Sequence, residues 1–249
     1  MRNYWILSAF LGLALGCNTV DSSTTDTAGM YADLRAVASG NGSTEVAAWL
    51  KLDEGSLDFI GLTGGDTLRA YMIHPVTGAE TQATMVEGSF AGATWYTADF
   101  DIQDANTSFR VELDRTATSK VSALNSTTSI PTPFTLSTIP ANTTSFSRTS
   151  ATTLDVTWDP FNFTSADQLS YEVDGSCIQK RQESINWQTA TSVQIANHFL
   201  QSLSGQETNS CEITVTITLT RNGSVDPAFG KGGEFLGSQA REIKLTANP

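Results

Sequence analysis

The sequence is poor in charged residues, in histidine and in cysteine, and each shortage narrows what the chain can do. Only 16% of the 249 residues are charged, and Asp plus Glu outnumber Lys plus Arg by 26 to 14. An acidic chain of this kind repels phosphate backbones, so we expect no nucleic-acid partner. Little charge together with abundant Ser and Thr indicates the polar but uncharged strand surfaces of a β protein.

Motifs for common catalytic chemistry are also missing. The two histidines, His74 and His198, stand 124 residues apart, which excludes a compact zinc motif such as H-E-x-x-H. The sequence has no G-x-S-x-G nucleophile elbow, and Gly230 and Lys231 lack the flanking residues of a phosphate-binding loop. We interpret His74 as a turn residue and His198 as a half-buried residue of a short helix. The chain is therefore predicted not to be an enzyme and to need no cofactor.

The first seventeen residues, MRNYWILSAFLGLALGC, have the pattern of an export signal. Arg2 supplies a short positive region, and the run from Ile6 to Leu15 is apolar. That run is about half as long as the roughly twenty apolar residues that a membrane-spanning helix needs. Its end, LALGC, resembles the lipobox of bacterial lipoproteins.

That resemblance implies a signal peptide at 1–16 and a lipid on Cys17. In this family a diacylglycerol is attached to the cysteine thiol, and the new amino terminus is acylated, as with palmitate. Asn18 is not the Asp that retains such proteins at the inner membrane, so the resemblance implies an outer-membrane lipoprotein facing the periplasm or the cell exterior. An ordinary signal peptide with a chance cysteine is the alternative.

Export would place the remaining cysteines, Cys177 and Cys211, in an oxidising compartment. With Cys17 consumed by lipid, an even pair is left, and its separation of 34 residues suits a stabilising disulfide. Two thiols without a neighbouring histidine cannot complete a tetrahedral metal site. We therefore predict a Cys177–Cys211 disulfide.

We predict a flexible tether at 17–30. Downstream of it, the sequence pattern predicts a series of short strands. EVAAWLKLD (45–53) places alternate apolar residues on one face, and similar runs are bounded by Gly, Pro, Asn or Asp. These runs are SLDFIGL, TLRAYMIH, ETQATMVE, ATWYTADFD and TSFRVELDR. Strands spaced at about ten residues, without a helical period between them, predict an antiparallel β-sandwich over 31–136.

A second sandwich is predicted over 137–249. TLDVTWDP (153–160) and LSYEVDG (169–175) alternate apolar residues, and SCEITVTITLTRNG (210–223) is the most regular strand pattern in the chain. The first two segments resemble the second and third strands of fibronectin type III or immunoglobulin-like domains. The resemblance implies that the third and sixth strands are antiparallel neighbours, which would bring Cys177 beside Cys211. The fold class expected is thus all-β, with two tandem immunoglobulin-like antiparallel sandwiches.

Two groups of residues are candidate ligand contacts. Asp99, Asp101, Asp104 and Asn106 carry oxygen ligands that could hold Ca²⁺ in an interstrand loop, although a solvated loop is the simpler interpretation. Trp187 lies in a polar stretch and could stack on a sugar or anchor a partner, although such a tryptophan more often caps a core.

Three functions remain open at this stage. The leading hypothesis is a non-catalytic lipid-anchored envelope protein that presents its sandwiches to a protein or glycan. The second is a periplasmic accessory factor that joins an envelope or secretion assembly by strand addition. The third is a glycan-acting hydrolase, because paired carboxylates need no sequence motif.

Overall fold

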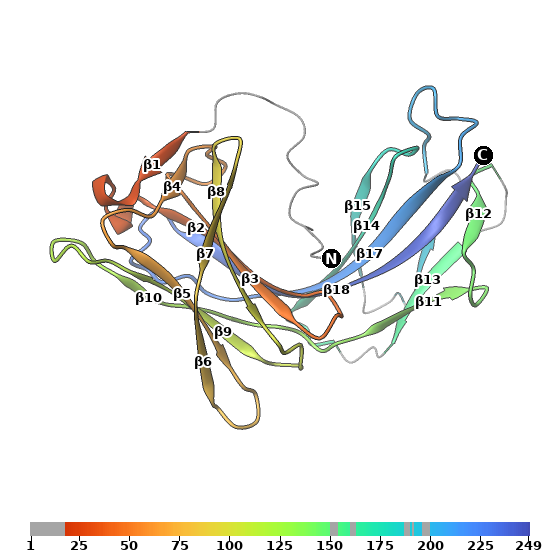
Figure 1. Ribbon diagram of the computed structural model, residues 1–249. Helices are drawn as coiled ribbons and strands as arrows, with labels where there is room; N and C mark the ends of the chain where they lie inside the picture. Colours follow the sequence, from red (N-terminus) through yellow and green to blue (C-terminus); the bar gives the residue numbers. More distant parts are fainter. Residues whose placement is uncertain (1–17, 150–153, 160–162, 187–189, 191, 196–199) are drawn as a thin grey trace.

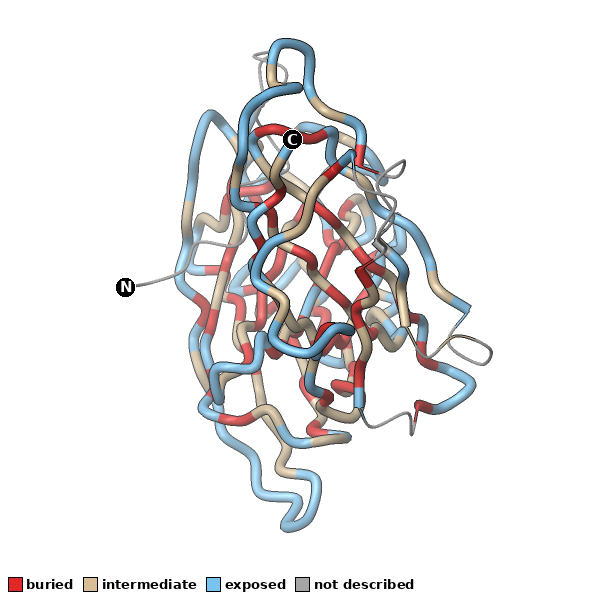
Figure 2. The backbone as a smooth tube through the Cα atoms, turned by 90° about the vertical axis from the view of Figure 1, so that its right-hand side faces the viewer, coloured by how far each residue is buried: buried red, intermediate tan, exposed pale blue. Residues whose placement is uncertain are grey.

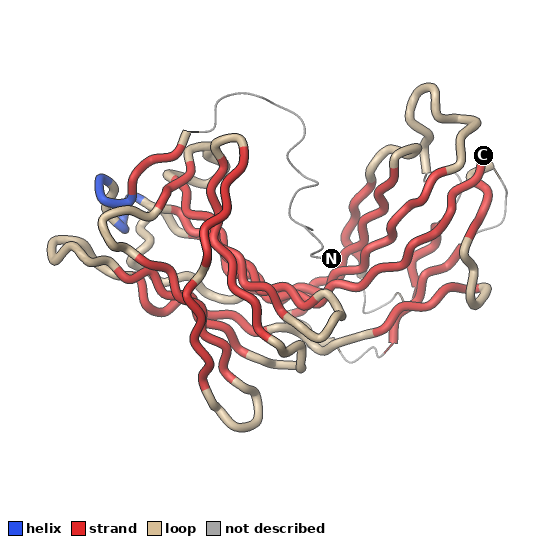
Figure 3. Tube along the Cα trace, viewed as in Figure 1, coloured by secondary structure: helices blue, strands red, loops and turns tan. Residues whose placement is uncertain are grey.

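The computed structural model describes residues 18–149, 154–159, 163–186, 190, 192–195 and 200–249. The predictions for the signal peptide, Cys17, Trp187 and His198 lie outside these residues. Within them nearly all of the regular secondary structure is β-strand, as predicted. Figure 3 shows helical turns beside one end of the strands. These turns are η2 (Ser22–Thr24) and η3 (Thr27–Gly29).

The strands form three sheets, of which one runs through the whole molecule (Figure 1). The path of this 11-stranded sheet is β1 (Thr19–Asp21), β4 (Phe59–Gly61), β3 (Thr44–Lys51), β2 (Tyr31–Ala38), β18 (Gly233–Asn248), β17 (Cys211–Asn222), β14 (Asp167–Gly175) and β15 (Arg181–Ile185). Off this path, β12 (Ser145–Ser147) pairs with β18, β8 (Ala93–Phe100) with β3, and β7 (Val86–Phe90) with β8.

Two smaller sheets cover the two halves of the long sheet. The four-stranded sheet is β10 (Ala123–Ser129), β9 (Ser108–Asp114), β5 (Thr67–Ile73) and β6 (Glu80–Thr84). The three-stranded sheet is β11 (Thr135–Ile139), β13 (Leu154–Asp159) and β16 (Ser192–Ile195). Most neighbours are antiparallel, but β1 with β4, β12 with β18 and β2 with β18 are parallel.

Each smaller sheet encloses a separate hydrophobic core against the long sheet, which gives two sandwiches. Figure 2 shows that the buried residues lie on the strands inside the molecule and that most exposed residues lie on its outer loops. The predicted alternation holds, because every second side chain of a strand points to the same face. In β3, for example, Val46, Ala48 and Leu50 are fully buried. In the second core, Trp158 of β13 and the apolar residues of β14 and β17 are buried in the same way.

Strand β18 belongs to both cores. Its first part, 233–239, pairs with β2 on one side and buries Phe235 in the first core. On the other side β17 pairs with it from Leu236 to Ala247, and Leu245 lies in the second core. Phe229 also lies in the first core, and Phe134, which the predicted boundary at 136 assigns to the first sandwich, packs in the second. The cores therefore do not divide the chain at one point.

The predicted tether at 17–30 is wrong for its described part, 18–30. Strand β1 pairs with β4, and Ser22, Thr27 and Met30 are buried. The sequence suggested a tether because the segment is polar, but its hydroxyl and carbonyl groups are bonded to partners far along the chain. Arg115, for instance, donates from Nη2 to the carbonyl oxygens of Ser22 at 2.6 Å and Thr25 at 3.1 Å.

The predicted disulfide is confirmed. Cys177 follows the end of β14, Cys211 begins β17, and their Cα atoms are 5.8 Å apart. β14 and β17 are antiparallel neighbours, with Gly175 opposite Ile213, so the end of one strand lies beside the start of the other. This is the strand relationship that the immunoglobulin-like resemblance implied.

Candidate interaction surface

Residues 80–90 form a strand edge that nothing covers among the described residues. β6 is the outer strand of the four-stranded sheet, and β7 pairs only with β8. All of their residues except Ala83 and Gly88 are exposed. We call the strands and the residue between them the β6–β7 edge.

The chain crosses from one sheet to the other within this edge. Met85 stands between the two strands, is only 6% exposed, and donates its backbone N–H to the carbonyl oxygen of Leu68 at 3.0 Å. Its side chain packs in the first core. Burial of Met85 thus fixes the crossing point, while most residues of β6 and β7 remain exposed to solvent.

The turn between β7 and β8 indicates which backbone groups of β7 face outward. Phe90 lies opposite Ala93, and the two intervening residues, Ala91 and Gly92, have φ angles of 50° and 84°. A two-residue hairpin turn with positive φ at both positions closes on a hydrogen-bonded pair. Because hydrogen-bonded pairs alternate along a ladder, Glu87 and Ser89 direct their N–H and C=O groups away from β8.

Apolar side chains lie beside these free backbone groups. Val86 is 69% exposed and Phe90 is 59% exposed. The indole ring of Trp95 lies across Gly88, where a Cβ atom would stand 2.6 Å from the ring. The edge therefore combines unpaired backbone groups with apolar and aromatic surface.

Tyr96 holds β7 in place from the buried side of β8. Its hydroxyl accepts a hydrogen bond from the Leu62 N–H at 2.7 Å and lies 3.3 Å from a carboxylate oxygen of Glu87. Burial, with a smaller contribution from the Glu87 charge, raises the pKa of Tyr96 well above its usual value. The phenol therefore stays neutral and can donate to Glu87.

The opposite edge of the four-stranded sheet, formed by β10, is covered. In β10, Thr127 exchanges backbone hydrogen bonds with Ser224, both at 2.8 Å. The Asp226 carboxylate accepts from the backbone N–H groups of Leu124 at 2.9 Å and Asn125 at 2.8 Å. Proteins commonly protect sheet edges in this way, so the bare β6–β7 edge stands out by comparison.

The hairpin formed by β5 and β6 projects from the first sandwich (Figure 1). At its tip, His74 Nδ1 accepts hydrogen bonds from the backbone N–H groups of Val76 at 3.2 Å and Thr77 at 3.3 Å. His74 is therefore the turn residue that the sequence predicted. Val76, at 86% exposure, points into solvent.

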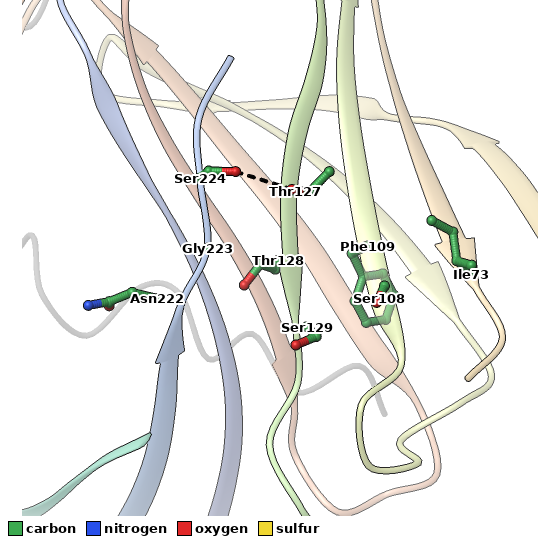
Figure 4. A pocket seen from close by; sticks show the side chains of 9 residues that line it. All are labelled: Ile73, Ser108, Phe109, Thr127, Thr128, Ser129, Asn222, Gly223 and Ser224. Carbon is green, nitrogen blue, oxygen red and sulfur yellow. Dashed lines mark hydrogen bonds between the residues drawn. The ribbon is translucent and has the colours of Figure 1, made fainter. Parts of the chain in front are cut away.

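A shallow, open hollow of about 440 Å³ lies between β9, β10 and the end of β17. Figure 4 shows the side chains that line it. Six of its nine lining residues carry a hydroxyl or amide group, and Thr127 Oγ1 lies 3.2 Å from Ser224 Oγ. Its lining residues are Ile73, Ser108, Phe109, Thr127, Thr128, Ser129, Asn222, Gly223 and Ser224. None of them is a carboxylate, so this hollow lacks the acid pair that a glycan hydrolase uses.

The candidate calcium residues are not gathered into a metal site. Asp99, Asp101 and Asp104 are all exposed, and no three His, Cys, Asp or Glu side chains of the described chain form a group that could hold a metal ion. Asn106 accepts a hydrogen bond from Arg221 Nη1 at 3.0 Å through its side-chain oxygen. The side-chain oxygen of Asn106 therefore already has a guanidinium partner. No helix in the described residues is both long and apolar enough to span a bilayer.

The fold and this surface define an all-β protein of two sandwiches that share one long sheet. No protein-family model matches the sequence, and no curated protein matches it. Among solved structures, the crystal structure of the chicken CNTN1 FN1–FN3 domains is 9% identical with a TM-score of 0.27, over 87% of this chain and 66% of that one. The adhesin InvE of Yersinia pseudotuberculosis is 12% identical with a TM-score of 0.23, over 88% of this chain and 59% of that one. Both scores are too low to carry an argument.

Proposed function

We propose that this protein is a non-catalytic, lipid-anchored envelope protein that uses the β6–β7 edge to bind an extended segment of a protein partner. The observation that carries the proposal is the uncovered edge with its outward backbone groups and exposed Val86. An added strand would satisfy those groups with main-chain hydrogen bonds, while apolar side chains supply selectivity. Because a glycan has no matching backbone ladder, the edge favours a protein over a glycan.

The lipid anchor in this proposal is supported by the LALGC sequence that ends at Cys17. Several acyl chains on one residue bury enough CH₂ groups for stable attachment, whereas one chain would be marginal. The expected consequence is that Cys17→Ser protein leaves the membrane fraction. Retention of that variant on membranes would contradict lipid anchoring.

The edge is tested with a photo-crosslinking amino acid at Gln82, which is exposed on β6. We expect a discrete adduct in cells, and its loss when Ser89→Pro removes an outward N–H without touching the ladder to β8. Ser89→Ala is the matched control and keeps the adduct. An adduct that survives Ser89→Pro would show that the partner does not pair with β7.

Protease treatment of intact and lysed cells distinguishes the two roles that this edge permits. Degradation on intact cells would make surface adhesion the role, whereas protection until lysis would make it a periplasmic accessory factor. The hydrolase alternative is not favoured by any observation at the hollow or the edge.

A further inference from the structure

Asn18, the residue next to the proposed lipid, is already bonded to the first sandwich. The carbonyl oxygen of Asn18 accepts a hydrogen bond from the Phe59 N–H at 2.9 Å, and Thr19 lies opposite Phe59 in the parallel β1–β4 pair. Cys17 is the preceding residue, and consecutive Cα atoms are about 3.8 Å apart. A lipid on Cys17 would therefore leave no spacer between bilayer and protein.

Two exposed apolar side chains lie beside this point. Thr19 lies opposite Phe59 in the β1–β4 pair, and Leu57, two residues before Phe59, is 45% exposed. On the other side of β1, Thr19 Oγ1 donates to the carbonyl oxygen of Gly92 at 3.2 Å, in the turn after Phe90. Figure 1 shows the start of β1 next to this β7–β8 turn. We call Leu57, Phe90 and the start of β1 the anchor surface.

Hydrogen bonds attach the N-terminal segment firmly to the first sandwich. Ser22 Oγ donates to the Asp66 carboxylate at 2.8 Å, and its carbonyl oxygen accepts from Arg115. Lys120 Nζ also donates to the carbonyl oxygen of Thr25 at 2.8 Å. These bonds hold 18–30 against the first sandwich, so the orientation of the body follows that of residue 18.

We propose that the anchor surface rests on the bilayer that holds the Cys17 acyl chains, with Leu57 and Phe90 inserted at the lipid interface. This inference depends on the proposed lipid anchor. Interfacial apolar groups bury about 5 to 10 Å into the headgroup region. Two such side chains would bind weakly by themselves, but the lipid keeps them at a high effective concentration at the membrane.

Charge near the anchor surface indicates which lipids it accepts. Asp53 and Glu54, in the same loop as Leu57, are exposed, and Asp53 has a single ion pair, with Lys231 at 3.5 Å, in the described chain. Acidic side chains are repelled by anionic headgroups. The surface should therefore contact zwitterionic lipid better than anionic lipid.

This orientation places the hairpin tip at Val76 away from the membrane. In Figure 1 the β5–β6 turn lies at the far end of the first sandwich from the β7–β8 turn. The β6–β7 edge would then run from the bilayer outward, with Phe90 at the lipid and Glu80 in solution. A partner strand could pair along β6 and along β7 as far as Ser89, which would leave Phe90 to the lipid.

The test uses the lipidated protein in phosphatidylcholine vesicles that contain a lipid with a nitroxide on its headgroup. A dye on Glu54→Cys reports contact at the anchor surface, and a dye on Thr77→Cys reports the hairpin tip. We expect strong quenching at 54 and little at 77. Quenching at 54 should fall several-fold in Leu57→Ser/Phe90→Ser but not in Val76→Ser, the matched exposed control.

Each outcome separates this inference from the proposal on which it depends. Protein that floats with vesicles but shows equal quenching at 54 and 77 would overturn the inference and leave the lipid anchor intact. Quenching at 54 that persists in Leu57→Ser/Phe90→Ser would also overturn it, because the lipid alone would explain the contact. Protein that does not float with vesicles would refute the anchor and the inference together.

Discussion

At the residue scale, a buried ion pair joins the N-terminal segment to the first sandwich. Arg115 Nε lies 2.9 Å from an Asp66 carboxylate oxygen, with the two side chains 0% and 3% exposed. Arg115 also donates to Thr27 Oγ1 at 3.0 Å. A buried cation needs all of these partners, because an unpaired charge in a low-dielectric interior is strongly unfavourable.

We therefore expect Asp66→Asn to lower the free energy of unfolding by about 3 to 5 kcal/mol. The matched control is Asp114→Asn, whose carboxylate pairs with Arg69 at 3.0 Å on the surface, with side-chain exposures of 33% for Arg69 and 41% for Asp114. That substitution should change the free energy of unfolding by less than about 1 kcal/mol. Urea denaturation measures both, and equal losses would contradict the argument.

Asp167 gives the second sandwich a stability that depends on pH. Burial would raise the pKa of this carboxyl, but hydrogen bonds from Arg221 and from the Thr164 N–H together hold the pKa below its usual value. A pKa that is lower in the folded state stabilises the fold above the unfolded value of about 3.9, and this contribution is lost as pH falls through the folded pKa.

The expected result is that Asp167→Asn is less stable than the parent protein at neutral pH. The difference should shrink as pH falls below about 4, because the parent carboxyl then becomes protonated. Urea midpoints measured across this pH range give the comparison. A difference between the two proteins that stays constant with pH would refute the role assigned to Asp167.

At the element scale, the disulfide fastens the end of β14 to the start of β17. The double variant Cys177→Ala/Cys211→Ala should lose about 3 kcal/mol, since the bond closes a loop with a sequence separation of 34 residues. A reducing agent should lower the urea midpoint of the parent protein and leave that of the double variant unchanged. A parent protein insensitive to reduction would contradict this prediction.

Comparison of the predicted and observed strands shows where the local sequence pattern was sufficient to predict a strand. Strands such as β3, β14 and β17 were predicted correctly, because their alternating apolar residues report burial on one face. Residues 229–237, FGKGGEFLG, have no alternating apolar pattern, yet β18 begins at Gly233. Glycines obscured that strand. At Gly237 a Cβ atom would stand 2.2 Å from the Ser129 carbonyl oxygen, so close contact with another strand requires glycine there.

At the scale of the whole molecule, the two sandwiches are joined by buried polar contacts as well as by β18. Gln239 is fully buried, and its Nε2 donates to the carbonyl oxygens of Gln103 at 2.9 Å and Pro131 at 3.2 Å. Arg241 donates to the carbonyl oxygen of Phe134 at 2.9 Å, and burial lowers the pKa of its guanidinium. Separation of the two cores would leave these groups unpaired.

We therefore expect the two cores to unfold together. Leu245→Ala, in the second core, should lower the free energy of unfolding by about 2 to 5 kcal/mol. In hydrogen exchange with increasing urea, β2 of the first core and β14 of the second should lose protection at one common midpoint, shifted equally by the variant. Two separate midpoints would show that the sandwiches are independent domains.

The sequence by itself determined the all-β class, the alternating faces of the strands and the pairing of Cys177 with Cys211, because each depends on local pattern or on a short count of residues. Only the tertiary structure decided that 18–30 is ordered, that β18 serves both cores and that the β6–β7 edge is bare. These features depend on pairings between distant parts of the chain, such as Arg241 with the carbonyl oxygen of Ala38 at 3.1 Å. Local periodicity carries no information about which distant strand supplies a partner or leaves an edge open.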